Sequence, residues 1–334
     1  SEIYTCSLKL RMLSLFCHAE GGIRDRSPSR GLGDVYKRQE YHPGTGIETT
    51  TGPLGQGIAN SVGFAIAEEI LKKKIGKEII NHKTYVLAGD GCLMEGISHE
   101  AMSLAGHLKL KNLVMLFDNN SISIDGPTSL AVSDNFKKRF ESYGWDYILI
   151  NGHNKKEIFT ALQKVKNAKR PTVISCKTKI GYGSPNKAGK ASSHGSPIGT
   201  DEIKLVRKVL GWKYKPFEIP KNILHEWRKI GKKGEKIESS WNNVYKRKKQ
   251  TIDKILKNNF SKTLKAEKQN SIKVNKSLAS RKASELTLNA LTKGSNTLIG
   301  GSADLAGSNN TKTKHHNTIK PNDFNGDYIH YGVR

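Results

Sequence analysis

The stretch TYVLAGDGCLMEGISHEAMSLAGHLKLKNLVMLFDNN, residues 84–120, decides the fold. Two short apolar runs, Thr84–Ala88 and Leu113–Phe117, have the length of buried strands. Between them, Ile97–Leu110 has the apolar spacing of a helix. A strand, a helix and a second strand in this order predict two neighbouring strands of a parallel sheet.

Each of these strands is followed by a polar turn. The first runs into Gly89-Asp90-Gly91 and the second into Asp118-Asn119-Asn120. Ligands bind at the carboxyl ends of parallel strands, so Asp90 and Asn120 are candidate site residues. A hard divalent cation takes carboxylate and amide oxygens, and glycines on both sides of Asp90 would let a diphosphate approach the backbone. Either turn alone is more often an ordinary loop, but the pair, with 28 residues between Gly91 and Asn120, is similar to the signature of thiamine-diphosphate enzymes.

The same alternation continues outward along the chain. After the turn-rich segment that ends at Gly57, helical apolar spacing begins, and it runs through Ile58, Val62, Ala65, Ile66 and Ile70. Further elements are expected at Asp134–Tyr143 (helix), Tyr147–Ile150 (strand), Lys155–Asn167 (helix), Thr172–Cys176 (strand), Leu286–Leu291 (helix) and Thr297–Ile299 (strand). The predicted fold class is α/β, a doubly wound, mostly parallel sheet with helices on both faces, followed by the start of a second α/β domain.

Composition limits the classes of function. The 334 residues carry 56 Lys and Arg against 30 Asp and Glu, a formal net charge of +26. Such charge allows a noncatalytic basic protein that binds nucleic acid. The excess lies in Lys-dominated stretches without a recognition motif, which favours solvated helix faces and no nucleic-acid partner. No apolar run approaches the ~18 residues of a membrane span, and the four scattered cysteines suggest a reducing, cytoplasmic setting.

Longer motifs extend the likeness. In order and spacing, the chain resembles transketolases over ETTTGPLGQG (48–57), GDGCLMEGIS (89–98), SLAGH (103–107), ISIDG (122–126), IGYGSPNKAG (180–189), HG (194–195), GGSADL (300–305) and YIHYGVR (328–334). The resemblance covers residues 40–334 and is closer than that to other thiamine-diphosphate enzymes. It implies the thiamine-diphosphate-binding fold.

The resemblance implies a cofactor site for thiamine diphosphate and Mg²⁺, or Ca²⁺ or Mn²⁺ in its place. The metal ligands would be the side-chain oxygens of Asp90 and Asn120 and the carbonyl of Ile122. Gly91 would contact the diphosphate, and Ile180 the thiazolium ring. The remaining cofactor residues would be Gly52, Pro53 and Leu54 against the aminopyrimidine, Glu95 in an acidic network linking paired sites, His194 against the diphosphate, and Asp304 reaching across a subunit interface.

The resemblance also implies the reaction and its substrates. His194 would be the catalytic residue that contacts both diphosphate and substrate, and Arg281 and Ser308 would hold the sugar phosphate. The activity would be transfer of a two-carbon ketol unit from a ketose phosphate to an aldose phosphate in the pentose phosphate pathway. The full-length protein would be a homodimer. A dihydroxyacetone synthase-like relative, which differs in acceptor, is the alternative.

The likeness suggests a chain truncated at both ends. Residues 1–39 lack apolar periodicity and predict a foreign or disordered segment, and Asp34–Gln39 is what a sequencing-library adapter would encode. The expected domains are a diphosphate-binding (PP) domain at 40–216, a helical Lys-rich tail and linker at 217–279, and the start of a pyrimidine-binding (PYR) domain at 280–334. Relatives carry a catalytic glutamate directly after the YGVR motif, so we expect this fragment to be inactive alone.

Overall fold

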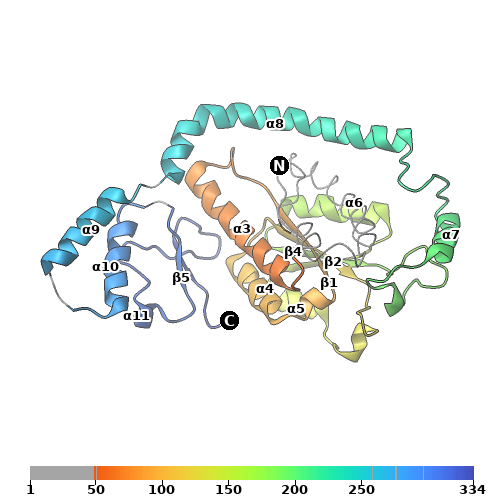
Figure 1. Ribbon diagram of the computed structural model, residues 1–334, viewed down its shortest axis with the longest axis horizontal. Helices are drawn as coiled ribbons and strands as arrows, with labels where there is room; N and C mark the ends of the chain where they lie inside the picture. Colours follow the sequence, from red (N-terminus) through yellow and green to blue (C-terminus); the bar gives the residue numbers. More distant parts are fainter. Residues whose placement is uncertain (1–48, 50, 258, 275–276, 296) are drawn as a thin grey trace, which may run out of the picture. The chain divides into compact units, whose positions relative to one another are not determined.

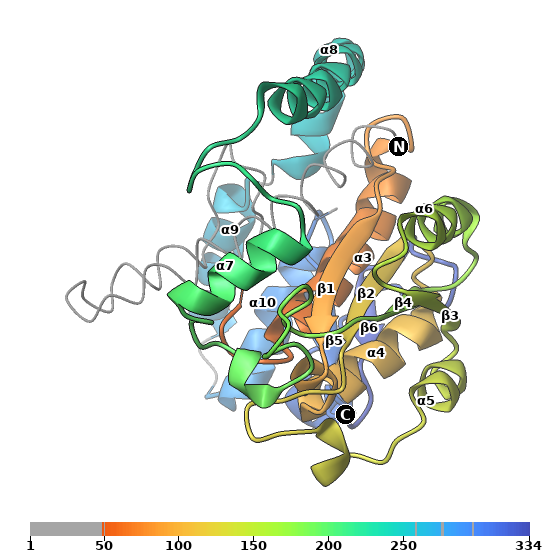
Figure 2. The same cartoon turned by 90° about the vertical axis from the view of Figure 1, so that its right-hand side faces the viewer.

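The computed structural model describes residues 49, 51–257, 259–274, 277–295 and 297–334, and between them Figure 1 and Figure 2 label the α-helices and strands. The segment 1–39, predicted to be foreign or disordered, lies outside the described residues. The described chain divides into two compact units. The first comprises the residues up to Ala65 together with His82–Ser240, and the second comprises Ile66–Asn81 together with Trp241–Arg334.

A four-stranded parallel sheet forms the centre of the first unit. Its strands are β1 (Thr84–Gly89), β2 (Leu113–Asn119), β3 (Asp146–Asn151) and β4 (Thr172–Lys177), in the order β1-β2-β4-β3. The four strands that the sequence predicts for this unit are confirmed, each one or two residues longer than expected. The prediction succeeded because strands of a parallel sheet read as short continuous apolar runs.

One face of the sheet is covered by α6 (Lys155–Lys164) and the short turn η3 (Val165–Asn167). The side chain of Asn154 begins α6 by accepting hydrogen bonds from the N–H groups of Lys156 and Glu157, an N-cap that satisfies otherwise unpaired donors. Ala161 and Val165 then pack into a cluster of buried side chains from three strands: Val114, Leu116, Ile150 and Ile174. Figure 2 shows α6 along this side of the sheet.

The opposite face is covered by α4 (Gly96–Leu108) and α5 (Phe136–Ser142). The ring of Phe117 on β2 meets Phe136 edge to face, with centroids 5.0 Å apart. The loop between α5 and β3 is held to α4 by Trp145, whose Nε1 donates to the carbonyl of Met102 at 2.8 Å. Helices therefore cover both faces, as the doubly wound prediction requires.

Helix α3 (Gln56–Ile75) begins directly after the predicted turn. All five apolar residues that predicted it are buried. The helix contributes residues to both units, because the division between them falls after Ala65.

The remaining elements are helical until the last short sheet. They are α7 (Thr200–Val209), α8 (Lys221–Leu256), α9 (Ser261–Val274), α10 (Ser280–Thr292), β5 (Gly300–Ser302), α11 (Ala306–Asn309) and β6 (Tyr328–His330). The helix predicted at Leu286–Leu291 lies within α10. No described helix is both long and apolar enough to cross a bilayer.

The strand predicted at Thr297–Ile299 is wrong. The strand is β5, which begins at Gly300 and pairs in parallel with β6. A Cβ on Gly301 would lie 2.4 Å from the ring of Tyr331, and one on Gly300 would lie 2.9 Å from the ring of Tyr328. Only glycines fit this close approach, and a pair of glycines carries no apolar signal by which sequence patterns find strands.

Candidate functional site

Asp90 follows β1 at the carboxyl edge of the sheet and is only 4 % exposed. Its Oδ2 accepts hydrogen bonds from the backbone N–H groups of Asn120 and Ser121, both at 3.2 Å. Its Oδ1 is buried and has no hydrogen-bond partner among the described residues. Burial raises the pKa of this carboxyl group, and the two backbone hydrogen bonds partly oppose that shift. One oxygen is thus anchored to the turn after β2, while the other is buried and finds no partner in the part of the chain that the structure describes.

Asn120 is oriented by its own turn. Its Oδ1 accepts from the N–H of Ile122 at 2.9 Å, and its Nδ2 donates to Asp118 at 3.4 Å. An amide oxygen has a second lone pair, so Oδ1 keeps acceptor capacity. Ile122 forms an isolated antiparallel bridge with Pro127. The two hydrogen bonds of this bridge are accepted by the carbonyls of Ser121 and Gly126. The carbonyl of Ile122 takes no part in them. The structure therefore brings the segments of Asp90, Asn120 and Ile122 together.

These donors fit a hard cation. A single carboxylate, one amide oxygen and one backbone carbonyl are ligands that Mg²⁺, Ca²⁺ and Mn²⁺ accept, with phosphate oxygens completing the shell. The structural observation that supports this fit is the buried Oδ1 of Asp90, which accepts no hydrogen bond from any described residue. In the described part of the chain, no group of three or more His, Cys, Asp or Glu residues is placed to hold a metal.

Sequence reasoning missed a cation beside these residues. Lys177 ends β4, where it is paired in register with Asn119. Its Nζ donates to Asn119 Oδ1 at 3.2 Å and to Ser121 Oγ at 3.0 Å. The hydroxyl of Thr178, the next residue, donates a hydrogen bond to Oδ1 of Asp118. The sequence places both residues at the end of a predicted strand, but only the structure shows that this strand lies beside the strand of Asn120.

The turn before α3 lies against the same edge. A Cβ on Gly55, whose φ is +82°, would lie 2.7 Å from Ile97 and 2.9 Å from the Cβ of Glu95. The side chain of Leu54, 49 % exposed, would lie 3.1 Å from a Cβ on Gly91. The structure thus brings Leu54, Gly91 and Glu95 together next to Asp90. Gly52 and Pro53, just before Leu54, are exposed.

The segment after β4 carries the other two predicted residues of this unit. It leaves the sheet beside Asn119, whose carbonyl accepts from the N–H of Thr178 at 3.2 Å. Ile180 is half-buried, and its carbonyl accepts from the N–H of Gly189 at 2.8 Å. His194 is exposed and ends the short helical turn η4 (Ala191–Ser193). The roles of both residues stay predictions.

Glu202 is a buried carboxylate that sequence reasoning missed. It lies in the first turn of α7 and accepts hydrogen bonds from the Ser184 hydroxyl and from the backbone and side-chain nitrogens of Asn186. These hydrogen bonds, that of Ser184 foremost, lower the pKa of Glu202 to about 2, with a smaller contribution from the ammonium of Lys187. An acidic residue at a helix start is common, so the sequence held no distinguishing signal.

We expect these hydrogen bonds to make the free energy of unfolding depend on pH. The folded-state pKa of Glu202, about 2, lies below the ordinary value of 4.5, so its contribution is full above 4.5 and is lost as the pH falls toward about 2. In urea unfolding, wild type should exceed Glu202→Gln in stability at pH 6, and the gap should narrow as the pH falls through this window. A gap independent of pH would show that the carboxylate charge is not responsible.

The three other predicted residues lie in the second unit. Arg281 is exposed in the first turn of α10. Asp304, with φ +65°, and Ser308 on α11 follow β5 and are exposed. Their proposed contacts with substrate and cofactor stay predictions.

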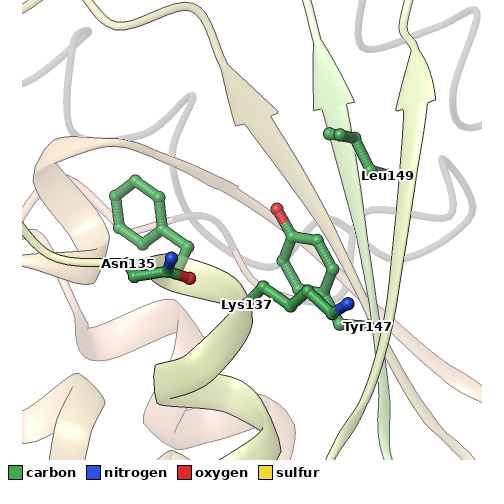
Figure 3. Close-up of a pocket in the computed structure, with 5 residues that line it drawn as sticks. Asn135, Lys137, Tyr147 and Leu149 are labelled. Carbon is green, nitrogen blue, oxygen red and sulfur yellow. The ribbon is translucent and has the colours of Figure 1, made fainter.

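A surface hollow of about 380 Å³ lies elsewhere in the first unit, between the start of α5 and the edge strand β3. Figure 3 shows the side chains that line it, which are Asn135, Phe136, Lys137, Tyr147 and Leu149. None of the predicted site residues is among them, so this hollow is separate from the carboxyl-edge site.

Known proteins resemble the chain in both sequence and structure. The family "Transketolase, thiamine diphosphate binding domain" matches residues 34–268. A transketolase of Buchnera aphidicola is 47 % identical over 313 residues, covering 88 % of this chain and 47 % of that protein. A transketolase of Sinorhizobium medicae is 43 % identical over 305 residues, covering 88 % of this chain and 43 % of that protein.

Solved structures agree. Transketolase from Campylobacter jejuni superposes with a TM-score of 0.76 at 36 % identity, covering 85 % of this chain and 44 % of that one. Transketolase of Pichia stipitis, in complex with sedoheptulose-7-phosphate, superposes with a TM-score of 0.75 at 34 % identity. The superposition covers 85 % of this chain and 45 % of that one. The chain spans a little under half the length of these relatives. From the family match and these identities, we conclude that the chain belongs to the transketolase family.

Proposed function

We propose that the carboxyl edge of the first unit binds the diphosphate of thiamine diphosphate together with Mg²⁺, or Ca²⁺ or Mn²⁺ in its place. The observation that carries this proposal is the Asp90 carboxylate, with one oxygen anchored by the turn of Asn120 and the other buried without a partner in the described chain. Asp90, Asn120 and the carbonyl of Ile122 hold the metal. Gly91 lies against the diphosphate.

The other residues orient the cofactor and substrate. When bound, thiamine diphosphate supplies a carbon nucleophile for attack on a ketose carbonyl. The exposed side chain of Leu54, with Gly52 and Pro53, offers an apolar face for the aminopyrimidine ring, and Ile180 packs against the thiazolium. His194 donates a hydrogen bond to the oxygen where negative charge develops.

For the whole protein, we propose transfer of a two-carbon ketol unit between sugar phosphates, within the pentose phosphate pathway. Relatives solved with sedoheptulose-7-phosphate and xylulose-5-phosphate support this substrate class. Arg281 and Ser308 hold the phosphate group of the sugar, a task for which the planar guanidinium is suited. The protein acts as a cytoplasmic homodimer, in which Asp304 reaches the cofactor of the partner subunit and Glu95 joins the network between sites.

Calorimetry on the 334-residue chain tests the cofactor site. Thiamine diphosphate should bind in the presence of Mg²⁺ and should not bind after chelation with EDTA. Inorganic diphosphate with Mg²⁺ should compete, because the proposed contacts are to the diphosphate and the metal. A chain that is folded by circular dichroism but binds thiamine diphosphate equally well with and without metal would overturn the metal assignment. A folded chain that binds neither compound would overturn the site itself.

A further inference from the structure

The segment 178–199, which carries Ile180 and His194, has a backbone rich in special conformations. Five of its glycines adopt a positive φ, namely Gly181, Gly183, Gly189, Gly195 and Gly199. Glycine loses more conformational entropy on ordering than any other residue. A segment that contains so many needs fixed contacts if it is to hold a side chain in a single place.

Glu202 supplies such contacts from α7. It is 7 % exposed, and both of its oxygens are used. Oε1 accepts from the Ser184 hydroxyl and from the N–H of Asn186 at 2.9 Å, and Oε2 accepts from Nδ2 of Asn186 at 2.8 Å. Hydrogen bonds to an ionised acceptor are about twice as strong as neutral ones. The carboxylate therefore ties the middle of the segment to a regular helix.

The hydroxyl of Ser184 links Glu202 to the next turn of the segment. A carboxylate is an acceptor only, so the Ser184 hydroxyl must donate its one hydrogen to Glu202. A lone pair of that hydroxyl then faces the N–H of Lys187, which donates to it at 3.1 Å. The turn from Ser184 to Lys187 is fixed at both ends by one serine oxygen.

The turn at Lys187 in turn holds the residue before His194. The carbonyl of Lys187 accepts from the Ser193 hydroxyl at 2.5 Å. On its other side, Ser193 is so close to Gly181 that a Cβ there would lie 2.8 Å from its Oγ. The N–H of His194 donates to the carbonyl of Ala191 at 2.8 Å. Side-chain hydrogen bonds, alternating with short pieces of covalent backbone, thus connect Glu202 to Ser193, and Ser193 is joined to His194 by the peptide bond.

We propose that Glu202 is a positioning residue that holds His194 in place through Ser184, Lys187 and Ser193. The inference rests on the proposed function, in which His194 contacts the diphosphate and the substrate. Glu202 itself touches neither. Its carboxylate is ionised at neutral pH, consistent with its role as an acceptor of three hydrogen bonds.

Hydrogen–deuterium exchange tests the positioning without any ligand. Glu202→Gln keeps one acceptor oxygen but turns an NH₂ group toward the NH₂ of Asn186, so amides of residues 184–194 should exchange roughly 10-fold faster. Peptides from β2 should be unchanged. Asp201→Asn is the matched control, because it removes the same charge from the same helix turn, and the Asp201 carboxylate is exposed and pairs with the exposed Lys204.

A compensating change separates this role from a general loss of stability. Adding Asn186→Asp to Glu202→Gln gives the new NH₂ group a carboxylate to donate to, so slow exchange at 184–194 should return. If Glu202→Gln leaves the exchange of this segment at the wild-type rate, the proposal fails. If the exchange rises equally in β2, Glu202 stabilises the unit as a whole and the proposal also fails.

Binding of thiamine diphosphate with Mg²⁺ then tests the link to His194. Glu202→Gln should weaken binding roughly 10-fold, as loss of a supporting partner does at other sites. His194→Ala should weaken it by a similar factor, and the double variant no further, because the two changes act on one contact. Full additivity would show that Glu202 does not act through His194. If the wild-type chain does not bind the cofactor, the proposed function fails, and the exchange experiment still decides whether Glu202 orders the segment.

Discussion

Asp90→Asn should abolish the Mg²⁺-dependent binding of thiamine diphosphate and leave the metal-free chain about as stable as wild type. The side chain is the only carboxylate among the proposed metal ligands, and calcium- and magnesium-type sites depend on ligand charge for their affinity. Loss of a supporting group beyond the ligands typically costs about 10–100-fold, so loss of the ligand charge should cost roughly 100-fold or more. Calorimetry measures this directly.

Stability of the metal-free chain should respond differently. In the wild type, the N–H groups of Asn120 and Ser121 donate to Oδ2 of Asp90. The amide oxygen of an asparagine at this position can still accept both hydrogen bonds. The change also removes a carboxyl group whose pKa is raised by burial and, to a smaller extent, by repulsion from Asp118. We therefore expect the free energy of unfolding to change by no more than ~1 kcal/mol without ligand.

A thermal-shift series separates the two effects. At a free ligand concentration of 100 times Kd, wild type gains about 2.7 kcal/mol from binding, and the variant should gain almost nothing. Asp125→Asn is the matched control: it removes the same charge from an exposed position in the turn after Ile122 and should bind as wild type does. Retention of wild-type affinity by Asp90→Asn would exclude Asp90 as a metal ligand.

The sheet and the proximity of Asp90 to Asn120 could be predicted because both depend on local patterns. Strands buried on both faces are apolar throughout, and parallel strands carry their polar turns to one edge. Asp90 and Asn120 each follow such a strand, so their proximity needs no knowledge of the rest of the fold. The hydrogen bonds from the turn of Asn120 to Asp90 confirm the proximity.

Other features depend on contacts that no local pattern contains. Glu202 reads as an ordinary acidic residue at a helix start, and its importance comes from Ser184 and Asn186 on a preceding loop. Lys177 ends a strand like any polar residue, and it matters only because β4 lies beside β2. Gly300 and Gly301 lie in a strand because they pair with β6, and aromatic rings there leave no room for larger residues.

Gly106→Ala should destabilise the first unit by roughly 3 kcal/mol, although alanine is the better helix former. In an exposed helix interior, the same change would stabilise by about 1 kcal/mol. Here the added Cβ would lie 1.7 Å from the carbonyl oxygen of Tyr143 and 3.2 Å from the ring of Trp145. The atom in the way belongs to the backbone, so no side-chain rotation relieves the clash.

The backbone near Tyr143 has little freedom to move away. Gly144 follows it with a φ of +82°, and Trp145 is fully packed and hydrogen-bonded to Met102 on the same helix as Gly106. A shift large enough to admit the methyl group would break that hydrogen bond or separate α4 from the loop before β3. Urea unfolding followed by circular dichroism should show the loss as a lower midpoint with an unchanged slope.

Gly63→Ala on α3 is the matched control, since a Cβ there meets nothing within 4 Å and the residue is exposed. This control should gain about 0.5–1 kcal/mol from helix propensity. A midpoint for Gly106→Ala at or above that of wild type would contradict the close packing of α4. Because α4 begins directly after Glu95, the destabilised variant should also bind thiamine diphosphate more weakly, whereas Asp90→Asn should lose binding without losing stability. The two variants together therefore distinguish a site that fails because its ligand charge is gone from one that fails because the helix behind it no longer packs.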